Sequence, residues 1–282
     1  MSSKKILPGR EASVIASHIG QLTWRGIGIF IILFSALLTG AVLLNNSTRF
    51  LEKNLVLVDK EPLFLPIYLS GVVLSIFIGL LASMRVAREL DKGTLELLFY
   101  GPVESRQYLS GVAIGYMGIG LASVLVILFW AKLSEMLLNL APDAKLFGLL
   151  LSVFLMICAF LALSLLIAIL GGKARNAIAY FVLAVFLLLS FQIGDSLLST
   201  LLLGGSATAT DALSLVRKIL YSVNEVLRWL SPFQITFEAA QNLNHGAITK
   251  YLIGNILLIA ETLILMTFAI LRLAGKGVRG ER

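Results

Sequence analysis

Long apolar stretches alternate with short polar segments along the whole chain. Six of these stretches approach or exceed the length of about 18 apolar residues that indicates a membrane-spanning helix. Because unpaired backbone groups cannot lie in hydrocarbon, each span is expected to be a helix. The predicted fold is an all-α, polytopic membrane protein with six transmembrane helices. The predicted spans are Gly26–Asn45, Leu63–Met84, Tyr108–Ala131, Leu146–Leu170, Ala177–Leu203 and Tyr251–Leu273.

The composition supports this class. Of the 282 residues, 58% are hydrophobic and 14% are charged, whereas soluble domains are about half apolar and a quarter charged. The net charge of +7 fits membrane topology better than nucleic-acid binding, because Lys and Arg accumulate on the cytosolic side of spans. The basic residues of the short loops predict that both termini are cytosolic, in a cell membrane that we expect to be the bacterial inner membrane.

Three segments outside the spans have patterns of their own. Residues 1–25 are expected to hold a cytosolic amphipathic interfacial helix, ahead of a single six-span domain of residues 26–282. Residues 85–107 form a charged cytosolic loop between the second and third spans. Residues 204–250 form an external helical loop before the last span.

The charged loop is predicted to contain a short helix. The pattern of the second span continues through Glu89 and is interrupted at Gly93, after which Thr94 can cap a new helix with Glu96 in its first turn. Its apolar residues are Leu95, Leu97, Leu98 and Phe99. These side chains either contact a partner protein or rest on the membrane surface, and the pattern alone leaves both alternatives open.

The segment MRVARELDKGTLELLFYGPVESRQYLSG (Met84–Gly111) resembles the corresponding segment of type-2 ABC-transporter permeases, closest to the gliding-motility and copper-maturation branch. The matching residues are Met84, Arg85, Arg88, Glu89, Gly93, Thr94, Leu95, Glu96, Leu97, Leu98, Pro102, Val103 and Arg106. Two further segments, Gly171–Phe181 with Asn176 and Leu230–Tyr251, are similar to other family stretches. Val112 departs from the pattern, because a lysine is common at that position.

The resemblance implies a function for the charged loop. In such permeases this loop carries a coupling helix that docks into a groove of a separate ATPase, where ATP and Mg would bind. The matching residues from Arg85 to Leu98, together with Arg106 and Asn176, are the implied coupling residues. The resemblance also implies an exporter in which two copies, or one copy and a sister permease, form the pathway.

Catalytic motifs are missing from the sequence. The chain has no P-loop pattern, no HExxH, no CxxC pair and no GxSxG. The two histidines, His18 and His245, are predicted to lie on opposite sides of the membrane, so they cannot share a metal. We therefore expect a transport subunit that is not an enzyme and holds no cofactor of its own.

Glu261 is an ionisable residue about ten residues into the sixth predicted span. Such a residue is costly in hydrocarbon and is a functional candidate by default. It could line the substrate pathway, carry a proton or make a buried contact to another helix. It motivates one alternative function, an ion-coupled secondary carrier. The long external loop motivates another, a non-transporting scaffold of an envelope complex.

The external loop has a helical pattern. Its apolar residues recur every three or four positions, and an amphipathic helix follows from that spacing. They are Leu213, Val216, Leu220, Val223, Leu227 and Leu230. Ser231, Pro232 and Gln234 then form a capping-box start for a second helix, Pro232–Leu243. We expect the two helices to form a lid over the outer end of the pathway, rather than to lie flat on the lipid.

Glycines in two spans indicate close packing. Gly71 and Gly79 in the second span, and Gly111, Gly115, Gly118 and Gly120 in the third, are expected to permit close approach between helices, either in ordinary packing or where two permease subunits meet.

Overall fold

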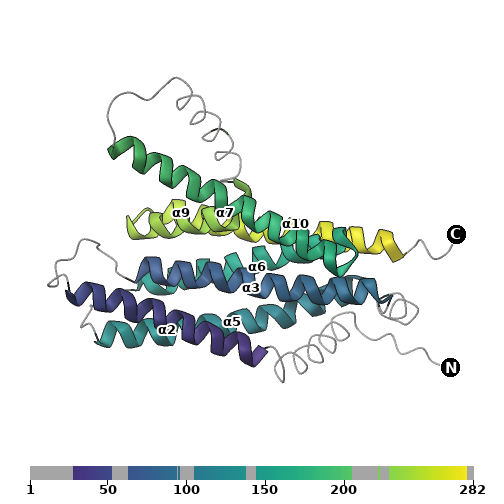
Figure 1. Cartoon of the computed structure of the whole chain (residues 1–282), viewed down its shortest axis with the longest axis horizontal. Coiled ribbons are helices and arrows are strands. Elements are labelled where there is room, and N and C mark those ends of the chain that lie inside the picture. The colour runs from purple at the N-terminus through teal and green to yellow at the C-terminus, as the bar shows by residue number, and fades with distance from the viewer. Residues whose placement is uncertain are drawn as a thin grey trace.

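The computed structural model describes residues 28–52, 63–93, 95, 105–137, 144–204, 222 and 229–277. These described residues form seven helices and no strand (Figure 1). The helices are α2 (Ile29–Glu52), α3 (Phe64–Asp91), α5 (Ser105–Leu137), α6 (Lys145–Gly171), α7 (Ala174–Gly204), α9 (Pro232–Asn244) and α10 (Ile248–Gly277).

Four of these helices, α3, α5, α6 and α10, are long and apolar enough to cross a membrane. Shorter apolar segments lie within two others, at Ile29–Leu43 in α2 and Ala174–Ser190 in α7. The all-helical, multi-pass membrane class predicted from the sequence is therefore confirmed. The predicted count of six spans stays a prediction.

Helix α6 forms the centre of the bundle. It contacts α3, α5, α7, α9 and α10, and most of its spanning segment is buried within the protein. Its sequence is apolar on every side, as expected for a helix that is covered all round. The core cluster accordingly includes Val153, Met156, Ile157, Phe160 and Leu165 of this helix.

The direction of each helix follows from pairs of contacts. Gly71 and Gly79 of α3 lie beside Val153 and Phe160 of α6, so these two helices are parallel. Helix α10 is also parallel to α6, whereas α5 runs opposite to α3 (Figure 1). One end of the bundle, called the Arg85 end below, therefore collects the last turns of α3, α6 and α10 and the first turns of α5 and α7. The other is called the Lys145 end.

The predicted close approach between helices is confirmed at three of these glycines. A Cβ atom placed on Gly71 would lie 2.6 Å from Val153, one on Gly79 would lie 3.1 Å from Phe160, and one on Gly120 would lie 3.0 Å from Ile157. At Gly118 no atom of the described residues lies within 4 Å of an added Cβ atom, so this glycine makes no close helix contact within one copy of the chain. The rotation of α5 turns this glycine to the exterior of the bundle.

Candidate functional site

Helix α3 ends within the charged segment. Its last residue is Asp91, and the chain turns at Gly93 with a φ of 67°. A positive φ is strained for residues with a Cβ atom, so glycine is suited to end the helix. The backbone N–H groups of Lys92 and Gly93 donate to the carbonyls of Arg88 and Leu90 at 3.0 and 3.2 Å. The predicted interruption at Gly93 is confirmed.

Glu89 joins the end of α3 to the start of α5. The Arg85 Nε atom donates to Glu89 Oε1 at 3.3 Å, one turn away on the same helix. The Tyr108 hydroxyl, from the first turn of α5, donates to the other carboxylate oxygen. Hydrogen bonds to an ionised acceptor are roughly twice as strong as neutral ones. The two ends of the charged segment are therefore held together by side chains.

A second tyrosine joins the same two helices deeper in the bundle. The Tyr116 hydroxyl donates to the Leu81 carbonyl at 3.5 Å and also lies close to Arg85. Both Tyr108 and Tyr116 are buried. They are eight residues apart on α5, or about 12 Å at the rise of an α-helix. Side-chain hydrogen bonds therefore join α3 and α5 at two levels near the Arg85 end.

The remaining coupling candidates fall into three groups. Leu95 is 1% exposed and belongs to the hydrophobic core. Arg88, Arg106 and Asn176 are exposed at the Arg85 end. Thr94, Glu96, Leu97 and Leu98 lie outside the described residues. The structure thus brings Arg85 and Glu89 together with Tyr108 and leaves polar groups exposed around them.

Helix α9 begins where the sequence predicted. Ser231 is the N-cap residue, its hydroxyl accepts from the Gln234 N–H at 3.5 Å, and Pro232 is the first helical residue. The reciprocal half of the capping box does not form, because the Gln234 side chain donates to Glu238 at 3.0 Å instead. The other lid candidates, Leu220, Val223 and Leu227, lie outside the described residues.

Helix α9 lies alongside α6 rather than across its end. At its C-terminal end, the Asn244 carbonyl accepts from Lys145 Nζ at 3.0 Å. At its N-terminal end, the Phe233 ring packs on Phe160 with 4.8 Å between centroids. Phe160 is fifteen residues after Lys145, or about 22 Å along α6. The start of α9 therefore lies deep in the bundle, and its function as a lid stays a prediction.

Glu261 is near the middle of α10 and is partly buried. Its Oε2 atom is buried and has no hydrogen-bond partner within the described part of the chain. Six residues earlier on α10, Asn255 makes a bond to another helix, because the Ser152 hydroxyl donates to Asn255 Oδ1 at 2.8 Å. An unpaired carboxyl oxygen in an apolar bundle is costly, so the position is a functional candidate on structural grounds as well.

The hydrogen bonds of the buried tyrosines are not predicted by the sequence. Tyr68 donates to the Phe233 carbonyl at 3.1 Å, and Tyr251 donates to the Gly148 carbonyl at 3.0 Å. From the sequence, Tyr108 is only the first residue of the third predicted span. One signal was present: a buried tyrosine usually finds a partner for its hydroxyl. Asn255 could have been flagged as a polar residue within a span, where such residues often bond across helices.

No metal site is found in the part of the chain that the structure describes, because no three His, Cys, Asp or Glu side chains gather there. No family model matches the chain, and no curated protein matches it.

Proposed function

We propose that the chain is the membrane-spanning permease subunit of an ATP-binding-cassette exporter. A separate ATPase would dock on residues 85–107 and drive the spans. The observation that carries this proposal is the Glu89–Tyr108 contact, which closes the charged segment at its base. A force applied to such a loop reaches α3 and α5 together, as coupling to a partner requires. The resemblance of Met84–Gly111 to type-2 permeases supplies the identity of that partner.

The proposal includes a topology. The segments of α2 and α7 would be the first and fifth spans, added to α3, α5, α6 and α10. Both termini would be cytosolic, which fits the directions of the first and last helices, because α2 runs away from the Arg85 end and α10 runs toward it (Figure 1). Lys173, Arg175 and Arg272 would then add to the cytosolic positive charge. Two copies, or one copy with a sister permease, would form the pathway.

Affinity purification in mild detergent tests the central proposal. A protein with a P-loop should co-purify with this chain, and mass spectrometry identifies it. Glu96→Arg and Leu97→Asp should each reduce its recovery, because losing an interface anchor costs about 2 kcal/mol or more. The matched control is Glu52→Arg, the same change at the far end of α2. Recovery that is equal in all variants would contradict docking at this loop.

ATP hydrolysis gives a second test. The sequence has no P-loop, so the purified chain in liposomes should not hydrolyse ATP, whereas the complex with its partner should. Hydrolysis by a preparation of this chain alone would contradict the proposal.

Glu261 favours a second candidate function, an ion-coupled secondary carrier. The unpaired Oε2 atom provides a group within the membrane that could exchange a proton. Under this alternative no ATPase co-purifies, and a pH gradient across liposomes that contain only this chain dissipates faster than across empty ones. Glu261→Gln should then abolish that effect.

A further inference from the structure

Exposed cations gather at the Arg85 end. They lie at the ends of α3 and α10 and around the starts of α5 and α7, and together they are called the basic belt below. The basic belt consists of Arg88, Lys92, Arg106, Lys173, Arg175 and Arg272. No hydrogen bond or ion pair engages any of these side chains within the described part of the chain. Their charges are therefore open to a partner.

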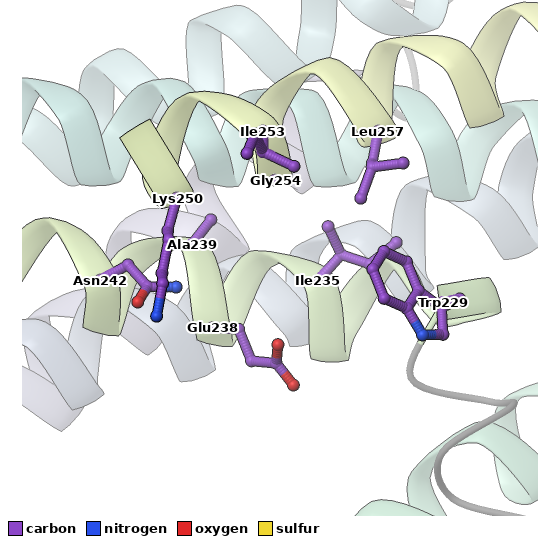
Figure 2. Close-up of a pocket in the computed structure, with 9 residues that line it drawn as sticks. All are labelled: Trp229, Ile235, Glu238, Ala239, Asn242, Lys250, Ile253, Gly254 and Leu257. Atoms are coloured by element: carbon purple, nitrogen blue, oxygen red, sulfur yellow. The ribbon is translucent and has the colours of Figure 1, made fainter. Parts of the chain in front are cut away.

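The two ends of the bundle differ in charge. Beside the basic belt, Asp91 is the one exposed acidic residue that the structure describes at the Arg85 end. At the Lys145 end the described charges are mixed in sign. Lys132 pairs there with Glu135 at 2.7 Å, and Figure 2 shows Lys250 and Glu238 lining the same groove between α9 and α10. Among the described residues, the excess of positive charge is thus a property of the Arg85 end.

The cations of the basic belt lie at nearly one depth. Arg88 is nine residues past Gly79, which lies beside Phe160 of α6. Arg272 is seventeen residues past the α10 residue that bonds Ser152 of α6. Because α3 and α10 both run parallel to α6, the two arginines are both level with about position 169 of that helix.

The other members of the basic belt lie slightly farther out. The Glu89–Tyr108 contact places Arg106 level with the end of α3, where the lysine of that helix lies. Lys173 and Arg175 flank the start of α7, just after the end of α6. The whole belt therefore spans about six residues, or about 9 Å, along the bundle.

This depth coincides with the boundary of the hydrocarbon. Lys250 and Arg272 are 22 residues apart on α10, or about 33 Å, and the hydrocarbon core is about 30 Å thick. Exposed apolar side chains lie on the inner side of the basic belt, at Leu271 and Phe268 of α10 and at Leu183 of α7. The headgroup layer adds about 5–8 Å on each side of the core, which is close to the thickness of the belt.

We propose that the basic belt binds a ring of anionic phospholipids, of the phosphatidylglycerol class, through their phosphate groups. The helices that carry the belt, α3, α5, α7 and α10, each contact the central helix α6. The cations are therefore distributed around that helix rather than on one face. A lipid layer contacts such a ring from all sides, whereas the groove of a protein contacts one side. The acyl chains lie over the apolar side chains immediately inward.

The sign of the charge selects the lipid. Phosphatidylcholine and phosphatidylethanolamine each carry a cationic group that balances their own phosphate, whereas the phosphate of phosphatidylglycerol is unbalanced. One Lys or Arg near the membrane surface favours an anionic lipid by about fivefold. Because the cations are spread around the circumference, a single lipid meets only part of the belt. The assignment depends neither on an ATPase partner nor on which side of the membrane this end faces, so it goes beyond the proposed function.

Electron paramagnetic resonance with spin-labelled lipids tests this assignment. The full chain is reconstituted in phosphatidylcholine vesicles with trace spin-labelled phosphatidylglycerol or phosphatidylcholine, and the motionally restricted fraction gives the relative association constant. We expect phosphatidylglycerol to associate about three- to fivefold more strongly. Salt at about 1 M should reduce this ratio, because the Debye length falls to about 3 Å.

A triple variant tests whether the basic belt causes the preference. Lys173→Gln, Arg175→Gln and Arg272→Gln together remove half of the belt, and none of these residues is an ATPase-coupling candidate. The ratio should fall to about two- to threefold. Lys173→Arg, Arg175→Lys and Arg272→Lys form the matched control, which keeps the charge and should keep the ratio. Lys250→Gln, at the opposite end, should also leave the ratio unchanged.

Photo-cross-linking locates the bound lipid. In a Cys158→Ala background, a single cysteine replaces either Ala179, exposed on α7 near the basic belt, or Leu252, exposed at the Lys145 end of α10. Each cysteine is labelled with a benzophenone maleimide, and vesicles with equal amounts of phosphatidylglycerol and phosphatidylcholine are irradiated. Phosphatidylglycerol should be enriched among the cross-linked lipids at position 179 and not at position 252.

The assignment would be overturned by equal association of the two lipids, by an unchanged ratio in the triple glutamine variant, or by equal enrichment at the two cross-linking positions. A chain without lipid preference whose triple glutamine variant recovers less ATPase would instead assign the basic belt to a protein partner.

Discussion

The Tyr68 hydroxyl on α3 donates a hydrogen bond of 3.1 Å to the backbone carbonyl of Phe233 on α9, across 165 positions of sequence. The bond is buried, and the Tyr68 ring also packs on Phe237 with 5.2 Å between centroids. The start of α9 is thereby fixed to the second predicted span.

Removing this hydroxyl should loosen α9. We expect Tyr68→Phe to lower the free energy of unfolding by about 0.5–1.5 kcal/mol, the usual contribution of one hydrogen bond. Denaturant unfolding in detergent measures this change in the free energy of unfolding. Tyr180→Phe is the control, because Tyr180 is exposed on α7. A loss of equal size in both variants would show that the Phe233 contact is not responsible.

The Glu89–Tyr108 contact should appear as a coupling energy. In a double-mutant cycle of Glu89→Ala and Tyr108→Phe, we expect about 1–3 kcal/mol, because the acceptor is ionised and the donor buried. The control cycle pairs Glu89→Ala with Tyr68→Phe, whose hydroxyl donates to the Phe233 carbonyl, far from Glu89 along α3. The control should give less than about 0.5 kcal/mol, and similar values in the two cycles would contradict a specific tie between α3 and α5.

Gly254 should tolerate no side chain. A Cβ atom there would lie 2.7 Å from the Ala239 Cβ atom, which cannot rotate away. We expect Gly254→Ala to separate α9 from α10 and to cost about 1–3 kcal/mol, the usual effect of overpacking. Gly118→Ala is the matched control, since nothing among the described residues lies within 4 Å of that position. Thermal unfolding compares the stability of the two variants. If Gly254→Ala were as stable as Gly118→Ala, the tight contact between Gly254 and Ala239 would be ruled out.

Replacing Glu261 with an apolar residue should stabilise the isolated chain. Its Oε2 atom is buried without a partner in the described part of the chain, and removing an unsatisfied polar group recovers about 1–3 kcal/mol. We expect the free energy of unfolding to increase in the order wild type, Glu261→Gln, Glu261→Leu. Thr267→Val is the control, because its hydroxyl already donates to the Leu263 carbonyl at 2.7 Å. Destabilisation by Glu261→Leu would instead indicate a structural partner, such as a second copy of the chain.

The ends of several elements followed from the sequence alone. The sequence predicted that α3 ends at Gly93 and that α9 begins at Ser231 and Pro232. Both are observed. These features depend on the conformations available to one residue and on hydrogen bonds within a few positions, so neighbouring residues are sufficient to specify them. The membrane class followed in the same way, because span length and polarity are local properties.

The contacts between helices were decided by the tertiary structure. The sequence did not predict that Glu89 meets Tyr108, that Tyr68 reaches Phe233, or that α9 descends along α6 and leaves a groove against α10. In a soluble helix the apolar stripe identifies the face that packs, but a span surrounded by lipid is apolar on every side. Rotation and register therefore depend on shape, on small residues and on single polar bonds between distant positions, and these are fixed only when the helices assemble.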